Sequence, residues 1–221
     1  MSKSLSQPIL YLITRGATIE TTSRESPEFQ DILLQIKAAV AAEIDLVQIR
    51  EKRLGARVLF ELAERAVEIT RESGTRILVN DRADIAAGAG AHGVHLTTRS
   101  LDVAVIRNSF EKRFLIGAST HSWEEAHQAY EQGADFVVLG PIFPTRSKEQ
   151  FGPSLGLEKL SDVCGKLGDF PVLALGGISE STAQQCFAAG ASGVAGISLF
   201  SEPTNLKGIV AAIKESAKGV L

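Results

Sequence analysis

The chain has 221 residues, of which 44% are hydrophobic and 22% charged, and its formal net charge is −3 at pH 7. These proportions are typical of a soluble globular protein, and the slightly acidic balance excludes nucleic acid and membrane surfaces as main partners. Two cysteines without metal-like spacing exclude a disulfide framework and favour a reducing compartment. The apolar run near the N-terminus is too short for a signal peptide or a membrane span. We therefore expect a cytoplasmic protein.

Short apolar runs alternate with amphipathic stretches along the whole chain. Strands are predicted at residues 9–14, 45–50, 76–80, 93–96, 114–118, 135–140, 171–175 and 193–198. Helices are predicted between them, including 31–42, 56–72, 123–131, 181–189 and 206–218. Eight strand–helix units of about 27 residues predict an α/β fold, a single (β/α)8 TIM barrel that forms one domain over residues 1–221. An open doubly wound sheet is the alternative, although no Gly-x-Gly-x-x-Gly motif follows a strand.

Polar residues alternate at the end of the second predicted strand. Gln48, Arg50 and Lys52 fall on one side of it, because successive side chains of a strand point to opposite faces. In a barrel such a side faces inward, and an amide and two cations would then meet at the barrel mouth. Their burial is costly unless an anion or a carboxylate neutralises them. The residues predict either an anion site or a strand end neutralised by Glu51 or Asp45.

Two further strand ends carry residues suited to chemistry. Asn80 and Asp81 follow the third predicted strand, where Asp81 either caps the next helix or ligates a hard cation. Magnesium would fit beside a polyphosphate, since it takes one or two carboxylates together with phosphate oxygens. After the fifth strand, Ser119 and His121 could donate hydrogen bonds or relay a proton, and Ser122 is expected to cap the following helix.

The other three histidines are interpreted as structural. His95 fits a core position with satisfied ring nitrogens, and His127 falls in the middle of a predicted helix, while His92 shows no sign of a site. A nucleophilic pair of Ser119 and His121 is not expected, because residues two apart on one short loop rarely reach in-line geometry.

The sixth predicted strand runs into the loop Gly-Pro-Ile-Phe-Pro-Thr-Arg-Ser-Lys, residues 140–148. Two hydroxyls, a guanidinium and an ammonium within four residues suit a polyanionic ligand, whereas a solvated basic loop is the alternative. Glycines at the ends of the last two strands suit a phosphate, although glycine also serves tight turns. The polar stretch 15–27 is either a lid over the same face or a surface loop.

Taken in order, the motifs QIREK, VNDRAD, IGASTH, GADFVVLGPIFPTRSK, LALGGIS and GVAGIS resemble the thiamine phosphate synthase family. They also resemble its close relatives, the thiazole tautomerases. The resemblance runs from about Ile9 to the C-terminus. The synthases join 4-amino-2-methyl-5-hydroxymethylpyrimidine diphosphate to 4-methyl-5-(2-phosphoethyl)thiazole, giving thiamine phosphate and pyrophosphate. The resemblance implies a transferase that works through a dissociative pyrimidine cation and needs no covalent nucleophile.

The resemblance also implies roles for the residues at matching positions. Contacts to the pyrimidine diphosphate are implied for Gln48, Arg50, Lys52, Asn80, Thr145, Ser147 and Lys148. Contacts to the thiazole phosphate are implied for Gly177, Ile197 and Ser198. Asp81 matches one ligand of a magnesium ion, which is the expected cofactor, and Ser119 matches a hydroxyl near the reacting centre. Lys148, Ser119 and His121 are the expected catalytic residues.

The stretch after the fourth strand departs from the family's pattern. The family usually reads His-x-Gly-Gln-x-Asp, whose final Asp is a second magnesium ligand, whereas this chain reads His-Leu-Thr-Thr-Arg-Ser and ends in Ser100. Asp102 could substitute only if the loop shifts. The first strand likewise ends in Thr14-Arg15 where the synthases commonly have Thr-Asp. A cation at Arg99 would contact phosphate directly, which predicts a weaker dependence on magnesium.

Two alternatives to the synthase stay open. One is a thiazole tautomerase, an isomerase in which the position of His121 handles a proton. The other is a non-catalytic relative that binds ligands without turnover. Asp81 and the intact Pro-Thr-Arg-Ser-Lys sequence favour the synthase, because a tautomerase has no diphosphate to bind. The expected partners are two phosphorylated small molecules, with neither nucleic acid nor membrane, and a homo-oligomer is compatible with the sequence.

Overall fold

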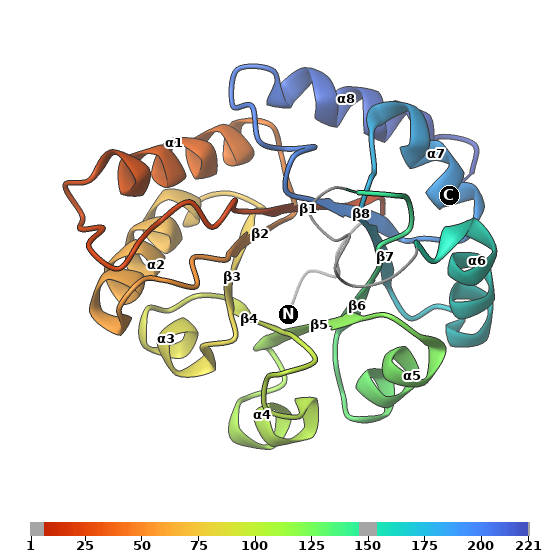
Figure 1. Ribbon diagram of the computed structural model, residues 1–221, viewed down its shortest axis with the longest axis horizontal. Coiled ribbons are helices and arrows are strands. Elements are labelled where there is room, and N and C mark those ends of the chain that lie inside the picture. The colour runs from red at the N-terminus through yellow and green to blue at the C-terminus, as the bar shows by residue number, and fades with distance from the viewer. Residues whose placement is uncertain (1–6, 146–153, 221) are drawn as a thin grey trace.

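A computed structural model describes residues 7–145 and 154–220 as a closed barrel of eight parallel strands, each followed by a helix (Figure 1). The strands are β1 (Ile9–Ile13), β2 (Leu46–Ile49), β3 (Arg76–Asn80), β4 (Gly93–Leu96), β5 (Leu115–Thr120), β6 (Phe136–Leu139), β7 (Val172–Leu175) and β8 (Gly193–Gly196). The helices are α1 (Pro27–Ala41), α2 (Ala56–Thr70), α3 (Ala83–Gly88), α4 (Val103–Ser109), α5 (Trp123–Glu131), α6 (Gly156–Leu167), α7 (Glu180–Ala188) and α8 (Leu206–Ala217). The predicted (β/α)8 TIM barrel is confirmed.

The barrel closes through pairing of the first strand with the last. Ile9 of β1 lies opposite Gly193 of β8, and every strand also pairs with its neighbour in sequence. Strand boundaries agree with the sequence-based ones within about two residues. Helix α1 begins four residues earlier than predicted, because Ser26 is extended (ψ 142°) and Pro27 has the ring-fixed φ that starts a helix.

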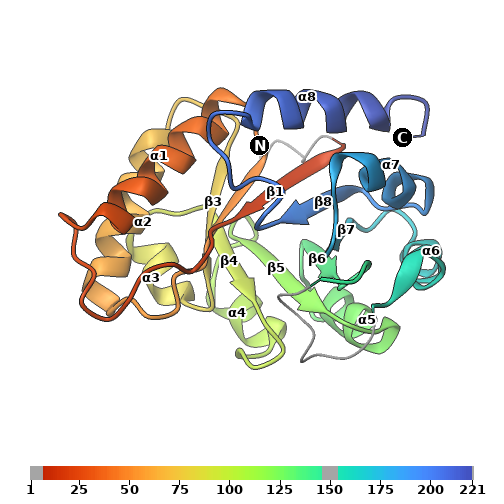
Figure 2. The same cartoon turned by 45° about the horizontal axis from the view of Figure 1, so that its top comes forward.

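Two layers of apolar side chains stabilise the fold. The inner layer fills the barrel and consists of Ile9, Tyr11, Ile13, Leu46, Leu78, Leu115, Phe136, Val138, Leu173 and Ala195. The larger outer layer lies between the strands and the helices, which surround the barrel (Figure 2). Because side chains alternate along a strand, seven of the strands contribute apolar side chains to both layers, whereas β4 has His95 on its inner side. Full burial of one such side chain contributes about 1.5–3 kcal/mol.

The segment between β1 and α1 is fastened to the barrel by a buried carboxylate. Glu51, which is 3% exposed, accepts hydrogen bonds from the hydroxyls of Thr14 (2.6 Å) and Thr18 (2.8 Å) and from the backbone N–H groups of Gly16 (3.0 Å) and Thr18 (3.2 Å). Thr18 and Thr22 are buried as a result. This segment, expected to be either a lid or a surface loop, therefore packs on the barrel and carries Arg15 to its mouth.

No helix within the two described ranges combines the length and the hydropathy that crossing a membrane requires.

Candidate active site

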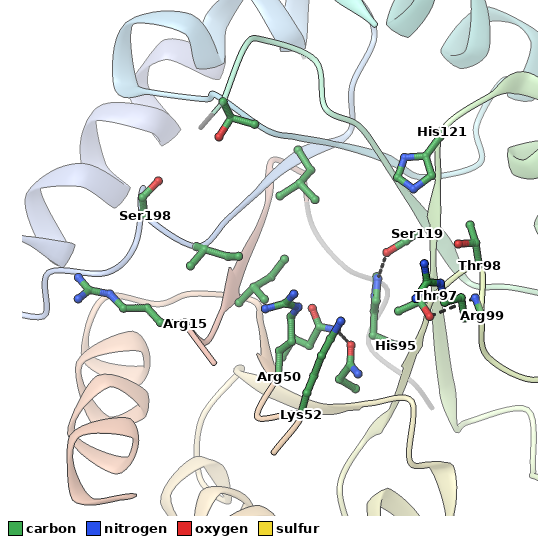
Figure 3. Close-up of a pocket in the computed structure, with 16 residues that line it drawn as sticks. Arg15, Arg50, Lys52, His95, Thr97, Thr98, Arg99, Ser119, His121 and Ser198 are labelled. Carbon is green, nitrogen blue, oxygen red and sulfur yellow. Dashed lines mark hydrogen bonds between the residues drawn. The ribbon is translucent and has the colours of Figure 1, made fainter. Parts of the chain in front are cut away.

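A cavity of about 600 Å³ opens at the carboxyl ends of the strands (Figure 3). Seven strands each contribute one side chain to its floor, either from near the carboxyl end of the strand or from the first residue after it. These residues are Ile13, Gln48, Asn80, His95, Ser119, Leu175 and Ile197. Its rim carries polar and charged side chains from the loops: Arg15, Arg50, Lys52, Thr97, Thr98, Arg99, His121, Thr145 and Ser198. In TIM barrels this end of the strands is where ligands bind.

The floor contains two hydrogen-bonded pairs of side chains on neighbouring strands. The Gln48 side-chain Nε2 donates to the Asn80 Oδ1 at 3.1 Å, which joins β2 to β3. The His95 Nε2 and the Ser119 Oγ lie 2.9 Å apart, which joins β4 to β5. The first pair leaves the Gln48 carbonyl and the Asn80 amino group for a ligand, an acceptor beside a donor. Such a pair can bind the edge of a nitrogen heterocycle.

The rim is rich in cations, several of which have no ion-pair partner among residues 7–145 and 154–220. Within the described residues, Arg50, Lys52 and Arg99 form no ion pair, whereas Arg15 pairs with Glu202 at 2.8 Å. In Figure 3, Arg50 and Lys52 lie centrally, with Arg15 and Ser198 to one side and Arg99 to the other. Cations gathered around a cavity that no described carboxylate lines favour an anion as the ligand.

The carboxylates expected to neutralise Arg50 and Lys52 act elsewhere. Glu51 binds the segment after β1, and Asp45 accepts the backbone N–H of Leu10 at 2.9 Å. The alternative of a strand end neutralised by these two residues is therefore wrong.

The pKa of Lys52 is lowered in the folded protein, in part by the neighbouring cations. Partial burial lowers the pKa of its ammonium, repulsion by Arg50 and Arg99 lowers it further, and attraction to Asp81 acts in the opposite direction. Four charged residues from the ends of β2, β3 and β4 thus share one electrostatic environment, in which three charges are positive.

Asp81 does not cap a helix. The residue before α3 is Arg82, no side chain caps that helix, and the exposed Asp81 has a left-handed backbone (φ 65°) while its N–H donates to the His95 carbonyl at 2.9 Å. The capping alternative is therefore wrong. No group of three or more His, Cys, Asp or Glu residues that could hold a metal occurs in the described part of the chain. One carboxylate fits magnesium only together with phosphate oxygens of a substrate.

Within the two described ranges, no carboxylate replaces Ser100 at the cavity. The Ser100 hydroxyl accepts the Thr97 N–H at 2.7 Å and closes the turn after β4. Asp102 lies just before α4 and lines a separate groove between α4 and α5. The loop shift that would bring Asp102 to the cavity is not present in this structure.

His121 is held in one tautomer. Its Nδ1 lies 2.5 Å from the carbonyl oxygen of Gly140, and its backbone N–H donates to Glu125 at 2.6 Å. Because a carbonyl only accepts, Nδ1 carries the proton, and in the neutral ring Nε2 is the basic nitrogen. Ser122 caps α5 by accepting the Glu125 N–H, as predicted.

The cavity brings together nine of the predicted site residues: Gln48, Arg50, Lys52, Asn80, Ser119, His121, Thr145, Ile197 and Ser198. Asp81 and Gly177 do not line it, and Ser147 and Lys148 lie outside the described residues. The lining also includes residues that the sequence does not predict, namely Ile13, Thr97, Thr98, Leu175 and, above all, His95. His95 is a buried core histidine, as predicted, but its interpretation as merely structural is wrong because it also lines the cavity beside Ser119. His92 and His127 lie away from the cavity, as expected.

The glycines after β7 have a packing role of their own. Gly176 (φ 99°) and Gly177 (φ 64°) are left-handed, and a Cβ on Gly177 would lie 2.6 Å from the Pro144 carbonyl oxygen. The turn therefore requires glycine in order to pack against the β6 loop. A phosphate cradle at Gly177 stays a prediction.

A closed (β/α)8 barrel whose carboxyl-end cavity is lined by cations without an ion pair in the described residues fits the class of TIM-barrel enzymes that bind phosphorylated ligands. A sequence profile described as thiamine monophosphate synthase matches residues 10–200. The chain belongs to the thiamine monophosphate synthase family.

Individual proteins show the same relationship. A thiamine-phosphate synthase of Methanoculleus marisnigri is 43% identical over 162 residues, which cover 73% of this chain and 76% of that protein. A thiamine-phosphate synthase of Roseiflexus castenholzii is 34% identical over 194 residues, covering 88% and 85%. The solved structure of thiamine phosphate pyrophosphorylase from Pyrococcus furiosus superposes with a TM-score of 0.76 at 28% identity and covers 96% of each chain.

Proposed function

We propose that this chain is a thiamine phosphate synthase, a transferase that joins the pyrimidine diphosphate to the thiazole phosphate and releases pyrophosphate. The observation that carries the proposal is the set of cations Arg50, Lys52 and Arg99, which have no carboxylate partner in the described residues and surround the cavity. Family membership supports the same activity.

The chemistry asks for charge neutralisation rather than for a nucleophile. The bond between the pyrimidine methylene and the diphosphate oxygen breaks, and its electron pair leaves with the diphosphate. The thiazole nitrogen then donates its lone pair to the methylene cation and forms the new carbon–nitrogen bond. Because negative charge grows on the leaving diphosphate, preorganised cations at that position lower the barrier.

Each part of the cavity has a role in this scheme. Arg50 and Lys52 bind the diphosphate, together with Ser147 and Lys148 of the segment outside the described residues. The Gln48–Asn80 pair binds the edge of the aminopyrimidine through its remaining acceptor and donor. Ile197 and Ser198, at the end of β8, bind the thiazole phosphate with Gly177 nearby, and Ser119 contacts the reacting centre from the floor.

Magnesium is part of the proposal as a joint ligand of protein and substrate. Asp81, which lies outside the cavity lining but attracts Lys52, would hold it with the diphosphate oxygens, since no carboxylate among the described residues lines the cavity. A bound magnesium ion supplies additional neutralisation of the leaving group. Arg99 contributes a fixed charge on the same side, so we expect the dependence on magnesium to be weaker than two carboxylate ligands would impose.

The test is a direct assay. Purified protein is incubated with both phosphorylated substrates and magnesium, and thiamine phosphate and pyrophosphate are quantified. We expect both products in equal amounts and their loss in Lys148→Ala. Binding of the substrates without any product, at high protein concentration, would contradict the proposal and indicate a non-catalytic relative.

The geometry of His121 favours one second candidate, a thiazole tautomerase. The Gly140 carbonyl fixes the Nδ1 proton and leaves Nε2 as a base at the cavity, which a proton transfer requires. Conversion of the thiazole tautomer that is lost in His121→Gln, with no thiamine phosphate formed, would support this candidate. Synthase activity retained in His121→Gln would count against an essential acid–base role.

A cytoplasmic location belongs to the same proposal, because both cysteines are free and buried thiols.

A further inference from the structure

His95 occupies a position that packing alone does not explain. Its side chain comes from β4 and is only 2% exposed, yet it lines the floor of the cavity. Its Nε2 lies 2.9 Å from the hydroxyl oxygen of Ser119 on β5, and the two side chains meet at the edge of the open space (Figure 3). A buried imidazole is thus aimed at the single hydroxyl on this part of the floor.

The surroundings hold the imidazole ring in place. The ring of Tyr11 lies 5.6 Å from the His95 ring and that of Phe136 lies 6.1 Å away, both measured between centroids. Gly117 on β5 leaves the necessary room, because a Cβ there would come within 2.8 Å of the His95 Nδ1 and 2.3 Å of the Phe136 Cζ. Three elements of the inner barrel therefore fix the ring with its Nε2 toward Ser119.

This fixed ring restricts the Ser119 hydroxyl. A serine hydroxyl has one proton to donate and two lone pairs, and it rotates freely unless a neighbour binds it. The bond to His95 Nε2 commits one of these sites and directs the others toward the cavity. A hydroxyl that is oriented before the substrate arrives does not have to be ordered during the reaction.

We propose that His95 is a positioning residue, which acts by orienting the Ser119 hydroxyl toward the reacting centre. The inference rests on the proposed function, since the orientation matters only if Ser119 contacts the substrates. It assigns His95 no direct contact with either substrate.

Two substitutions of similar size separate this role from packing. The amide nitrogen of His95→Gln reaches the place of the imidazole Nε2, whereas the amide of His95→Asn reaches only that of Nδ1. We expect His95→Gln to keep kcat within about threefold of the original and His95→Asn to lose about tenfold, with both KM values unchanged. His127→Gln, on the exposed face of α5, is the matched control and should leave kcat and KM unchanged.

A double-mutant cycle with Ser119→Ala tests whether His95 acts through Ser119. If it does, adding His95→Asn to Ser119→Ala lowers kcat by no more than about twofold, because the group it positions is already absent. Thermal unfolding of each variant shows whether the fold survives, and His95→Gln provides the comparison if His95→Asn is destabilised.

Three outcomes decide between the inferences. Rescue by His95→Gln together with a non-additive cycle supports the positioning role. Thiamine phosphate formation by the unaltered protein with an additive cycle, or with equal losses in His95→Gln and His95→Asn, overturns the positioning role alone. Absence of product from the unaltered protein overturns the proposed function, and the role of His95 falls with it.

Discussion

Arg107 and Arg50 place the same side chain at opposite ends of the barrel, in opposite situations. Near the amino ends of β5 and β6, Arg107 donates to Asp135 (2.6 Å) and to the carbonyls of Gly133 (2.9 Å) and Phe114 (2.8 Å). Asp135 is itself bound by the N–H of Ile116 at 2.7 Å. At the carboxyl ends, Arg50 has no carboxylate partner among the described residues.

The difference indicates where each charge finds its partner. The side chain of Arg107 is 18% exposed, and its partners are parts of the fold, so its charge stabilises the barrel. Arg50 lines an open cavity with Lys52 and Arg99, so their partner has to arrive as a ligand. The amino end of the barrel thus contributes stability and the carboxyl end contributes function, as is general for this fold.

The largest loss of activity is expected from substitution of Arg50 at the carboxyl end of the barrel. Arg50→Gln removes a cation from the leaving diphosphate and should lower kcat/KM by about 10²–10³-fold, with unchanged thermal stability. Steady-state kinetics and a melting curve measure both quantities. A loss of stability that matches the loss of activity would contradict the assignment of Arg50 to the ligand.

Substitution of Arg107 at the amino end of the barrel should instead lower the stability of the fold. Arg107→Gln leaves Asp135 and two carbonyls without their donor and should lower the free energy of unfolding by about 3 kcal/mol. Because Arg107 is remote from the cavity, kcat/KM of the folded protein should be unchanged. Urea denaturation gives the free energy, and a large kinetic defect in the folded fraction would refute the separation of the two ends.

Glu51 tests the boundary between the two roles, since it is a structural carboxylate placed beside the functional cations. Glu51→Ala removes all four hydrogen bonds to the segment after β1 and should cost about 2–3 kcal/mol of stability. Release of that segment also frees Arg15, so KM should rise more than kcat falls. If Glu51 instead neutralised Arg50, its removal would strengthen the binding of inorganic pyrophosphate, which calorimetry would detect.

A substitution of Arg99 tests whether this cation binds the anion without the help of a metal ion. Arg99→Gln should weaken the binding of inorganic pyrophosphate about tenfold in the presence of EDTA, because it removes a cation that acts without metal. Arg53→Gln, an exposed residue next to Lys52 that does not line the cavity, is the control. Equal affinities of the Arg99 and Arg53 variants under these conditions would show that Arg99 does not bind the anion.

The smallest expected effect is a change in pH dependence. The diphosphate binds the protonated Lys52, whose pKa burial and the neighbouring cations lower, so KM should rise as the pH increases through that lowered pKa. Arg99→Gln removes one source of repulsion and should move this rise to higher pH, whereas Lys52→Arg should abolish it. Kinetics from about pH 8 to 11 would measure the rise of KM in each variant. A rise of KM at lower pH in Arg99→Gln than in the original protein would contradict the prediction.

The same pKa has a consequence for stability. Folding lowers the pKa of Lys52, so between the folded and the unfolded value the unfolded chain binds more protons. Stability attributable to this group therefore increases with pH across that window.

Much of the cavity lining could be predicted because the alternation of side chains along a strand depends only on neighbouring residues. Gln48 and Arg50 alternate with buried Val47 and Ile49, and this period places the polar pair on the inner side of any barrel. His95 could not be assigned in this way. A polar residue inside an apolar strand looks the same whether it ends in the core or at a cavity, and only the pairing of β4 with β5 brings it to Ser119.

The number and order of the strand–helix units, the barrel, and most of the side chains that meet at its mouth could be predicted from the sequence. Periodicity and residue type carry that information because they act over a few residues. The tertiary structure alone decided which charges are neutralised. Glu51 adjoins Arg50 in the chain, yet it binds Thr14 and Thr18 from a distant segment, and this leaves Arg50 for a ligand. Charge pairing depends on distances in space, which the order of residues does not contain.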